Sequence, residues 1–185
     1  MNIDRENAWK LLNEYTKNQN LIKHMLAVES SMRLYAKLFN EDINWWGIVG
    51  LLHDFDYETY PDPKDHPSKG AVILNERGYD EDFIKTILAH APHTGEPRDT
   101  RAKKTIFAVD ELCGLIVAVA LVKPNKSLSE VEAKSVKKKM KDKAFARQVN
   151  RSEIIQGAEE LGISLNEHIE NVLKAMKVIS EELGL

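Results

Sequence analysis

The stretch Trp45-Trp-Gly-Ile-Val-Gly-Leu-Leu-His-Asp54 is an apolar run that ends in a histidine and an aspartate. A segment that is apolar on all sides is typical of a helix buried in a protein interior. The two polar residues stand where the apolar run stops, so we expect them at the end of that helix. His53 and Asp54 therefore bring two side chains of the kind that bind metals to the edge of the core.

The rest of the chain shows helical periodicity. Apolar residues recur every three or four positions in three segments, which is the spacing of one helix face. These stripes are Leu21, Met25, Val28, Met32, Tyr35 and Phe39; Ile106, Cys113, Val117 and Leu121; and Ile169, Val172, Met176, Ile179 and Leu183. The alternation typical of strands is not found. The sequence predicts an all-α, single-domain helical bundle of about eight or nine helices.

Several helix ends can be predicted from local signals. Gly78 is expected to end one helix and Asp80 to begin the next, because glycine adopts the left-handed conformation and aspartate caps free N–H groups. Ser164 and Glu167 have the spacing of a capping box in front of the last helix.

Composition and charge exclude several classes of protein. The 185 residues are 43% hydrophobic and 30% charged, with a net charge of −3, which argues against disorder and against a basic nucleic-acid-binding surface. One cysteine, Cys113, rules out an internal disulfide framework. The first ten residues do not resemble a signal peptide, and the longest uncharged apolar stretch, 112–122, is too short to span a bilayer. We expect a cytoplasmic protein without membrane contact; the sequence does not indicate an oligomeric state.

Three further polar residues have unusual positions. His24 flanks the apolar stripe of its helix, His90 follows Phe83 at helical spacing, and Asp110 lies within an apolar stripe. A buried carboxylate needs a cation, a proton or hydrogen-bond donors. Each residue alone fits a structural role, such as a hydrogen-bonded core histidine. Together with His53 and Asp54 they could also hold a divalent ion, and the spacing leaves both interpretations open.

At these residues the sequence resembles the HD-domain superfamily of metal-dependent phosphohydrolases. The resemblance rests on a histidine, a helix-ending His-Asp pair and a later aspartate, in an H…HD…D pattern over about residues 20–121. It implies a domain over 1–185, with the metal-site core at about 20–121 and a helical C-terminal extension at 127–185. It also implies that the first metal is held by His24, His53, Asp54 and Asp110.

Two more positions resemble the binuclear branch of this superfamily. The segment that begins His66-Pro67 and continues through Gly70 is similar to its HP…GA…L segment, and His90 is similar to the histidine that closes the following helix. The resemblance implies a second metal on His66 and His90, with Asp54 as the bridge. For His66, a position in a solvated loop beside prolines is the alternative.

The motifs differ from those of the branches with known substrates. The cyclic-di-GMP branch carries HDIGK, whereas this chain has His-Asp-Phe-Asp-Tyr at 53–57. The guanosine-tetraphosphate hydrolases carry an acidic pair after the His-Asp pair, and Asp56 and Glu58 are only a loose counterpart of it. The five-prime nucleotidase branch has a glutamate where this chain has Tyr57. We therefore expect a hydrolase acting on a small, nucleotide-like phosphate ester, either a monoester or a diester. A di-iron oxygenase and a regulatory ligand-binding module are the alternatives.

The expected cofactor is one or two divalent ions per chain: Mn, Mg, Fe, Co, Ni or Zn. Asp54, Glu58 and His93 are the expected catalytic residues. Asp56, Glu58 and His93 lie close in sequence to the ligands and could either move protons or hold the ligands by hydrogen bonds. The basic segment 134–151 holds eight Lys or Arg residues and one aspartate. It could attract an anionic substrate, but we favour the interpretation as a solvated helix face with Val136, Met140 and Phe145 turned inward. His168 fits no pattern and is interpreted as a residue at the flank of its helix.

Overall fold

The computed structural model describes residues 4–185, which form ten α-helices and two short 3-10 helices and contain no strand. The first five helices are α1 Arg5–Tyr15, α2 Gln19–Phe39, α3 Ile43–Leu52, α4 Ser68–Glu76 and α5 Glu81–Leu88. The others are α6 Arg101–Leu121, α7 Ala133–Met140, α8 Arg151–Glu160, α9 Leu165–Val178 and α10 Ser180–Leu183, with 3-10 turns at Pro92–Thr94 and Leu128–Glu130. The predicted all-α fold is confirmed.

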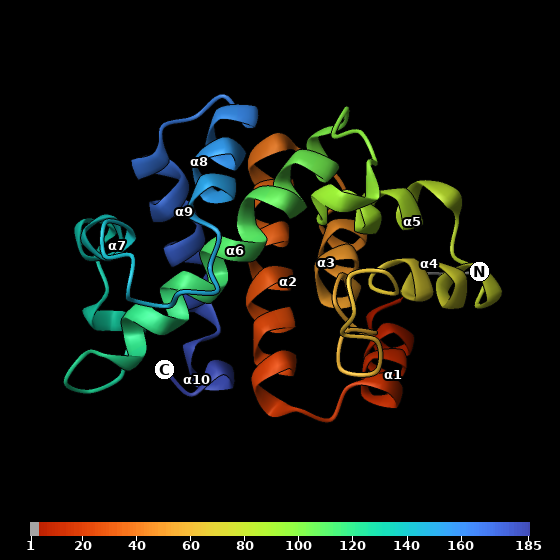
Figure 1. Ribbon diagram of the computed structural model, residues 1–185, viewed down its shortest axis with the longest axis horizontal. Helices are drawn as coiled ribbons and strands as arrows, with labels where there is room; N and C mark the ends of the chain where they lie inside the picture. Colours follow the sequence, from red (N-terminus) through yellow and green to blue (C-terminus); the bar gives the residue numbers. More distant parts are fainter. Residues whose placement is uncertain (1–3) are drawn as a thin grey trace.

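Two long helices, α2 and α6, form the centre of the molecule. Figure 1 shows α1, α3, α4 and α5 on one side of α2 and α7 to α10 on the other, with α6 running across it. The closest packing joins α2 to α3, where Gly50 lies against the backbone of Glu29. A Cβ at position 50 would lie 2.9 Å from the Cα of Glu29, so glycine permits this approach. The apolar run 46–52 is buried at this contact, as predicted.

The expected helix ends are found. Gly78 has a φ of 80° after α4, and the Asp80 side chain accepts a hydrogen bond from the N–H of Phe83 at the start of α5. The Ser164 side chain caps α9 by accepting from the N–H of Glu167. These caps satisfy N–H groups that would otherwise have no partner in the first turn.

Two sequence predictions about the later helices need correction. His168 is fully buried, not at a flank: its Nδ1 accepts a hydrogen bond from the Tyr35 hydroxyl at 2.6 Å, and its Nε2–H donates to the Ala108 carbonyl at 2.8 Å. It thereby joins α9 to both α2 and α6. Leu121, expected in the apolar stripe of α6, is 49% exposed because the helix extends beyond the core there.

Within residues 4–185, no helix combines the length and apolar character that crossing a bilayer requires.

Candidate metal centre

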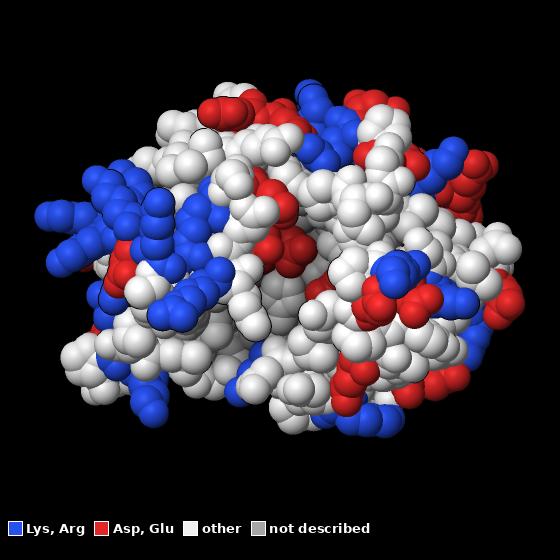
Figure 2. All heavy atoms as spheres, in the orientation of Figure 1, with Lys and Arg blue, Asp and Glu red and all other residues white. Residues whose placement is uncertain are grey.

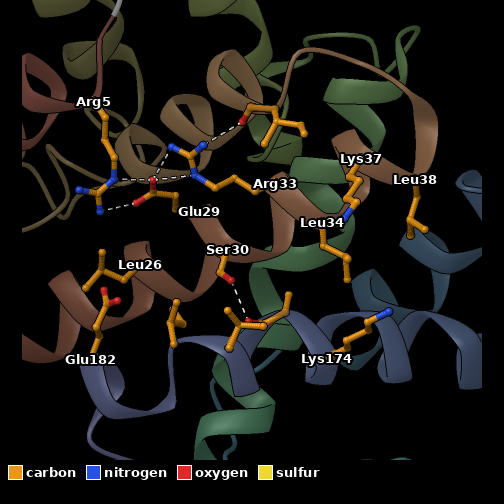
Figure 3. Close-up of a pocket in the computed structure, with 14 residues that line it drawn as sticks. Arg5, Leu26, Glu29, Ser30, Arg33, Leu34, Lys37, Leu38, Lys174 and Glu182 are labelled. Carbon is orange, nitrogen blue, oxygen red and sulfur yellow. Dashed lines mark hydrogen bonds and ion pairs between the residues drawn. The ribbon is translucent and has the colours of Figure 1, made fainter.

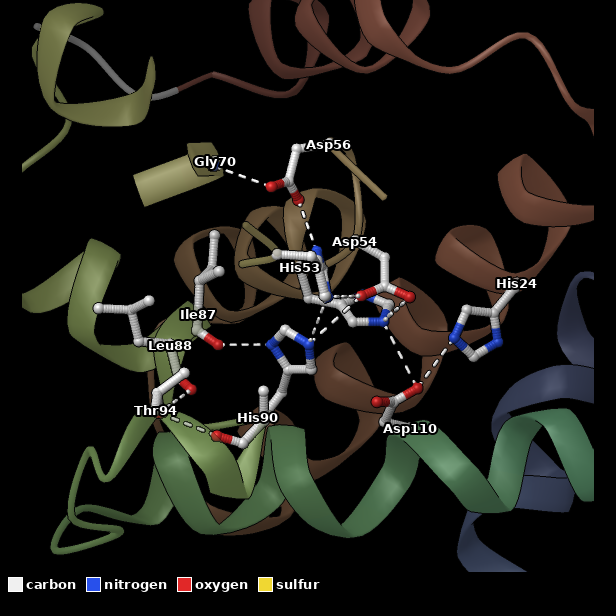
Figure 4. A network of polar contacts seen from close by, with 12 residues as sticks. His24, His53, Asp54, Asp56, Gly70, Ile87, Leu88, His90, Thr94 and Asp110 are labelled. Atoms are coloured by element: carbon white, nitrogen blue, oxygen red, sulfur yellow. Dashed lines mark hydrogen bonds and ion pairs between the residues drawn. The ribbon is translucent and has the colours of Figure 1, made fainter. Parts of the chain in front are cut away.

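Three helices bring four of the expected ligands together. His24 comes from the first turns of α2, His53 and Asp54 end α3, and Asp110 comes from the middle of α6. Asp110 Oδ1 lies 2.9 Å from His24 Nε2 and 3.5 Å from His53 Nε2. Figure 4 shows these side chains converging from separate elements. The spacing that suggested a shared site thus corresponds to a real cluster of side chains.

A second group of side chains meets the first at Asp54. His66 lies in the loop before α4, and His90 follows the end of α5. Asp54 Oδ1 is 3.1 Å from His66 Nε2 and 3.3 Å from His90 Nε2, while Asp54 Oδ2 is 3.6 Å from His53 Nε2. His66 is buried rather than solvated, so its loop folds back into the cluster. One carboxylate therefore stands between two sets of imidazoles.

Hydrogen bonds fix how three of the imidazole rings are turned. His53 Nδ1–H donates to the Gly50 carbonyl at 2.8 Å, and His90 Nδ1–H donates to the Ile87 carbonyl at 2.6 Å. Both carbonyls belong to the last turn of the helix that the histidine follows. With Nδ1 occupied in this way, Nε2 of each ring faces Asp54, and in the neutral ring it presents a lone pair there. Such outer hydrogen bonds orient imidazole ligands in metal sites.

The third ring, His66, is held by a carboxylate instead of a carbonyl. Asp56 is fully buried, and its Oδ1 accepts from His66 Nδ1 at 2.9 Å while its Oδ2 accepts from the Gly70 N–H at 2.8 Å. A Cβ on Gly70 would lie 2.7 Å from the Asp56 carboxyl carbon, so only glycine fits there. Asp56 therefore positions His66 and, through it, the second group.

Two features of the cluster call for a cation. His53 Nε2 is buried and has no hydrogen-bond partner in the described part of the chain, which is costly for a polar atom. His66 Nε2 and His90 Nε2 face one another at 3.3 Å. Because the Nδ1–H of each ring donates to another group, two nitrogen lone pairs would meet here unless a proton or a metal ion lies between them. The donor set of imidazole nitrogens and carboxylate oxygens suits divalent ions of intermediate hardness. The residues present fit a metal.

The cluster is held together by strong electrostatic attraction. Burial alone would lower the pKa of His53 and of His66. The carboxylates of Asp54 and Asp110 outweigh burial and raise the pKa of His53 to about 9. The carboxylates of Asp54 and Asp56 do the same for His66, whose pKa is also raised to about 9. Burial would likewise raise the pKa of Asp54, yet His53, His66 and His90 hold it well below the usual range. Both carboxylates, Asp54 and Asp110, are thus ionised and ready to bind cations.

The cluster opens into a pocket of about 400 Å³. Besides the ligands, it is lined by residues from the loops after α3 and α5, from α6 and from the start of α8. These are Tyr57, Ala91, Pro92, His93, Glu111, Gly114, Gln148 and Glu153. Four carboxylates line the pocket, and no lysine or arginine does so among the described residues. Figure 2 shows acidic side chains in a hollow on this face.

The structure places the two other expected catalytic residues differently. His93 lines the pocket, and its Nε2–H donates to the His66 carbonyl at 3.0 Å. Glu58 is exposed and not part of the pocket lining; its carboxylate accepts hydrogen bonds from the N–H groups of Lys17 and Asn18 before α2. Proximity in sequence to Asp54 did not bring Glu58 to the site, because the turn after α3 directs it towards the start of α2.

Two acidic residues of the pocket were missed from the sequence. Glu111 follows Asp110 directly, and burial together with Asp110 raises its pKa to about 7. Glu153 is in the first turn of α8. Only Glu111 had a detectable signal, a second acid inside a long apolar stretch. Glu153 reaches the pocket through the packing of α8 on α6, which no local pattern indicates.

The Lys and Arg side chains of the basic segment 134–151 lie beside the pocket, and from this segment Gln148 is the residue that lines it. The segment covers α7 and the loop that leads to α8, and Figure 2 shows Lys and Arg side chains gathered to one side of the hollow. Val136 is buried, and Met140 and Phe145 pack against the core. The segment is therefore a helix face with an apolar underside and solvated cations.

The comparison with known families agrees with this site. No curated protein and no solved structure gives a significant match to the chain. A model of the HD domain matches residues 21–115, more than half of the chain, and this range contains every residue of the two ligand groups. The chain therefore belongs to the HD-domain family, whose members are generally metal-dependent phosphohydrolases.

Proposed function

We propose that this protein is a metal-dependent phosphohydrolase that cleaves a small, nucleotide-like phosphate ester. The observation that carries the proposal is the position of Asp54. Its two oxygens are divided between His53 on one side and His66 and His90 on the other. A carboxylate in that position can bridge two ions, an arrangement that suits attack on a phosphoryl group.

The two ligand groups would hold the ions. His24, His53, Asp54 and Asp110 would bind the first ion, and Asp54 would share the second with His66 and His90. When bound, a divalent ion lowers the pKa of water to near ~7 and neutralises charge on a phosphoryl oxygen. The ligand chemistry is compatible with Mn, Mg, Fe, Co, Ni or Zn.

The charge of the pocket supports a substrate that depends on these ions. Asp54, Asp110, Glu111 and Glu153 line it without a lysine or arginine among the described residues, so bound ions would have to supply the charge that neutralises a phosphate dianion. A volume of about 400 Å³ suits a small molecule. Tyr57, 39% exposed at the pocket, offers a ring on which a nucleobase can stack.

His93 is the chain's own group for handling a proton. Because His93 Nε2–H donates to the His66 carbonyl, Nδ1 is the ring atom that remains free. A histidine at the rim of the pocket can pass a proton to the leaving oxygen. Asp54 would serve the same reaction by holding the ions.

The test is metal analysis of the purified protein, followed by a screen of nucleotides and phosphomonoesters with each divalent ion. Wild type is expected to hold metal and release phosphate, Asp54→Ala to do neither, and Glu58→Gln, an exposed acid near the site, to do both. Oxygen consumption with an iron-loaded sample and no phosphate release would favour the di-iron oxygenase instead. Ligand binding without turnover of any kind would favour the regulatory module.

A further inference from the structure

A second and larger cavity lies away from the metal centre. It has a volume of about 960 Å³ and runs between α2 and α9, with contributions from Arg5, Ile43 and α10. Its lining includes Leu26, Ser30 and Leu34 of α2. Successive helix residues advance by about 100°, so Leu26 and Ser30 lie on the side of α2 turned away from His24. The cavity shares no lining residue with the pocket at the metal centre. We call it the α2–α9 groove (Figure 3).

The groove has an apolar surface that is left in contact with water. Leu26 and Leu34 form its floor along α2, and three large apolar side chains at its edges are unusually exposed: Leu38 by 54%, Ile43 by 41% and Val178 by 80%. Exposed apolar residues that gather around one concave surface indicate a binding site.

The charges of the groove are divided between its two ends. At one end, Arg5 and Arg33 both donate to the buried carboxylate of Glu29, at 2.7–2.9 Å, and the carboxylate of Glu182 lies beside Leu26 (Figure 3). At the other end, Lys37 and Lys174 have no carboxylate within 4.0 Å among the described residues. Figure 3 shows these two lysines on opposite walls with Leu34 between them. The groove thus combines an apolar channel with a pair of unpaired cations at one end.

We propose that the α2–α9 groove binds an unbranched fatty carboxylate. The chain would lie along Leu26 and Leu34, and the carboxylate would sit between the ammonium groups of Lys37 and Lys174. From Leu26 to Lys37, α2 rises about 16 Å, which is the length of a chain of about twelve carbons at ~1.3 Å each. A second copy of this chain is a poor occupant, because four of the six charged side chains lining the groove are cationic and would face their own copies.

The test is calorimetric titration with dodecanoate, below its micelle concentration and at pH 8, on the full-length protein. We expect one molecule to bind per chain. Lys37→Gln/Lys174→Gln should weaken binding at least tenfold, whereas the matched double variant Lys138→Gln/Lys141→Gln, on the basic segment, should bind as wild type does. Dodecanol, which has the same chain without the charge, should bind at least tenfold more weakly than dodecanoate.

Four results would overturn the proposal: equal binding by Lys37→Gln/Lys174→Gln, equal loss in the control variant, equal binding of dodecanol, or uptake of many molecules per chain. A helical peptide with acidic and apolar faces should be titrated in parallel. If the peptide binds at the groove and dodecanoate does not, the site recognises a protein partner and our assignment is wrong. Circular dichroism of each variant excludes loss of folding as the cause, since both lysines are exposed.

Discussion

His168 should make the protein lose stability in mild acid. The imidazole is fully buried and neutral, and burial lowers its pKa to about 4, whereas in an unfolded chain it titrates near ~6.5. Between these two values the unfolded state binds the proton and the folded state does not. Stability is therefore fully present above about pH 6.5 and falls as the pH is lowered towards 4.

The size of the effect follows from the two pKa values. For a shift from 6.5 to about 4, the linkage relation gives a loss of about 2 kcal/mol at pH 5 and about 3 kcal/mol at pH 4. This is a large part of the free energy of unfolding of an ordinary domain, about 5–15 kcal/mol. Protonation would also turn Nδ1 into a donor, so its present hydrogen bond from the Tyr35 hydroxyl would have to reverse, with the hydroxyl oxygen accepting.

The assay is urea unfolding from pH 7.5 to pH 4 with a chelator present, for wild type, His168→Gln and Tyr35→Phe. We expect His168→Gln to be less stable at pH 7.5 but to lose less on acidification, so that the two curves converge. Tyr35→Phe removes a hydrogen bond but keeps the buried imidazole, so it should retain the acid sensitivity. The other histidines contribute equally to all three proteins. A constant difference between wild type and His168→Gln across this range would refute the argument.

Three further predictions concern the metal centre. Asp54→Ala should abolish turnover and the rise in Tm that metal produces, measured by thermal melts with and without Mn²⁺; an unchanged shift would mean that Asp54 is not a ligand. Gly70→Ala should displace Asp56, because the added Cβ would lie 2.7 Å from the Asp56 carboxyl carbon. The affinity for the second ion should then fall about 10–100-fold while the first ion still binds. A metal titration that shows two equally tight sites would contradict this. Glu58→Gln should keep its turnover, since the Glu58 carboxylate accepts from the backbone N–H groups of Lys17 and Asn18 before α2. A large loss of activity in a phosphatase assay would show that Glu58 does take part in the reaction.

The parts of the fold that the sequence predicts are those governed by local periodicity. The buried run that ends at His53, the caps at Asp80 and Ser164 and the all-α class depend on residues within one or two turns of each other. The cluster of His24, His53, Asp54 and Asp110 was also accessible, although the spacing alone left a structural role open. The resemblance to a family with an H…HD…D pattern pointed to one site.

Features that depend on distant partners could not be predicted. His168 is buried because Tyr35 and Ala108, which are 133 and 60 residues away, supply a donor and an acceptor. For Asp56 the sequence offered two roles, moving protons or holding a ligand, and its contacts to His66 and to the Gly70 N–H depend on how the loop folds. In each case the side chain is defined by tertiary contacts, which leave no periodic signal in the sequence.

The candidate ligands and the rest of the pocket wall come from different parts of the chain. The HD-domain match at 21–115 includes every candidate ligand, and it ends within α6. Gln148 and Glu153, which complete the wall of the pocket, come from beyond it, and so does His168, which ties α9 to the two helices that carry His24 and Asp110. The candidate ligands are thus contained in the matched segment, whereas part of the pocket surface is supplied by residues after α6. Proteins that share the ligands but differ after α6 would keep the proposed reaction and change the substrate, so the ligand pattern alone does not specify a substrate.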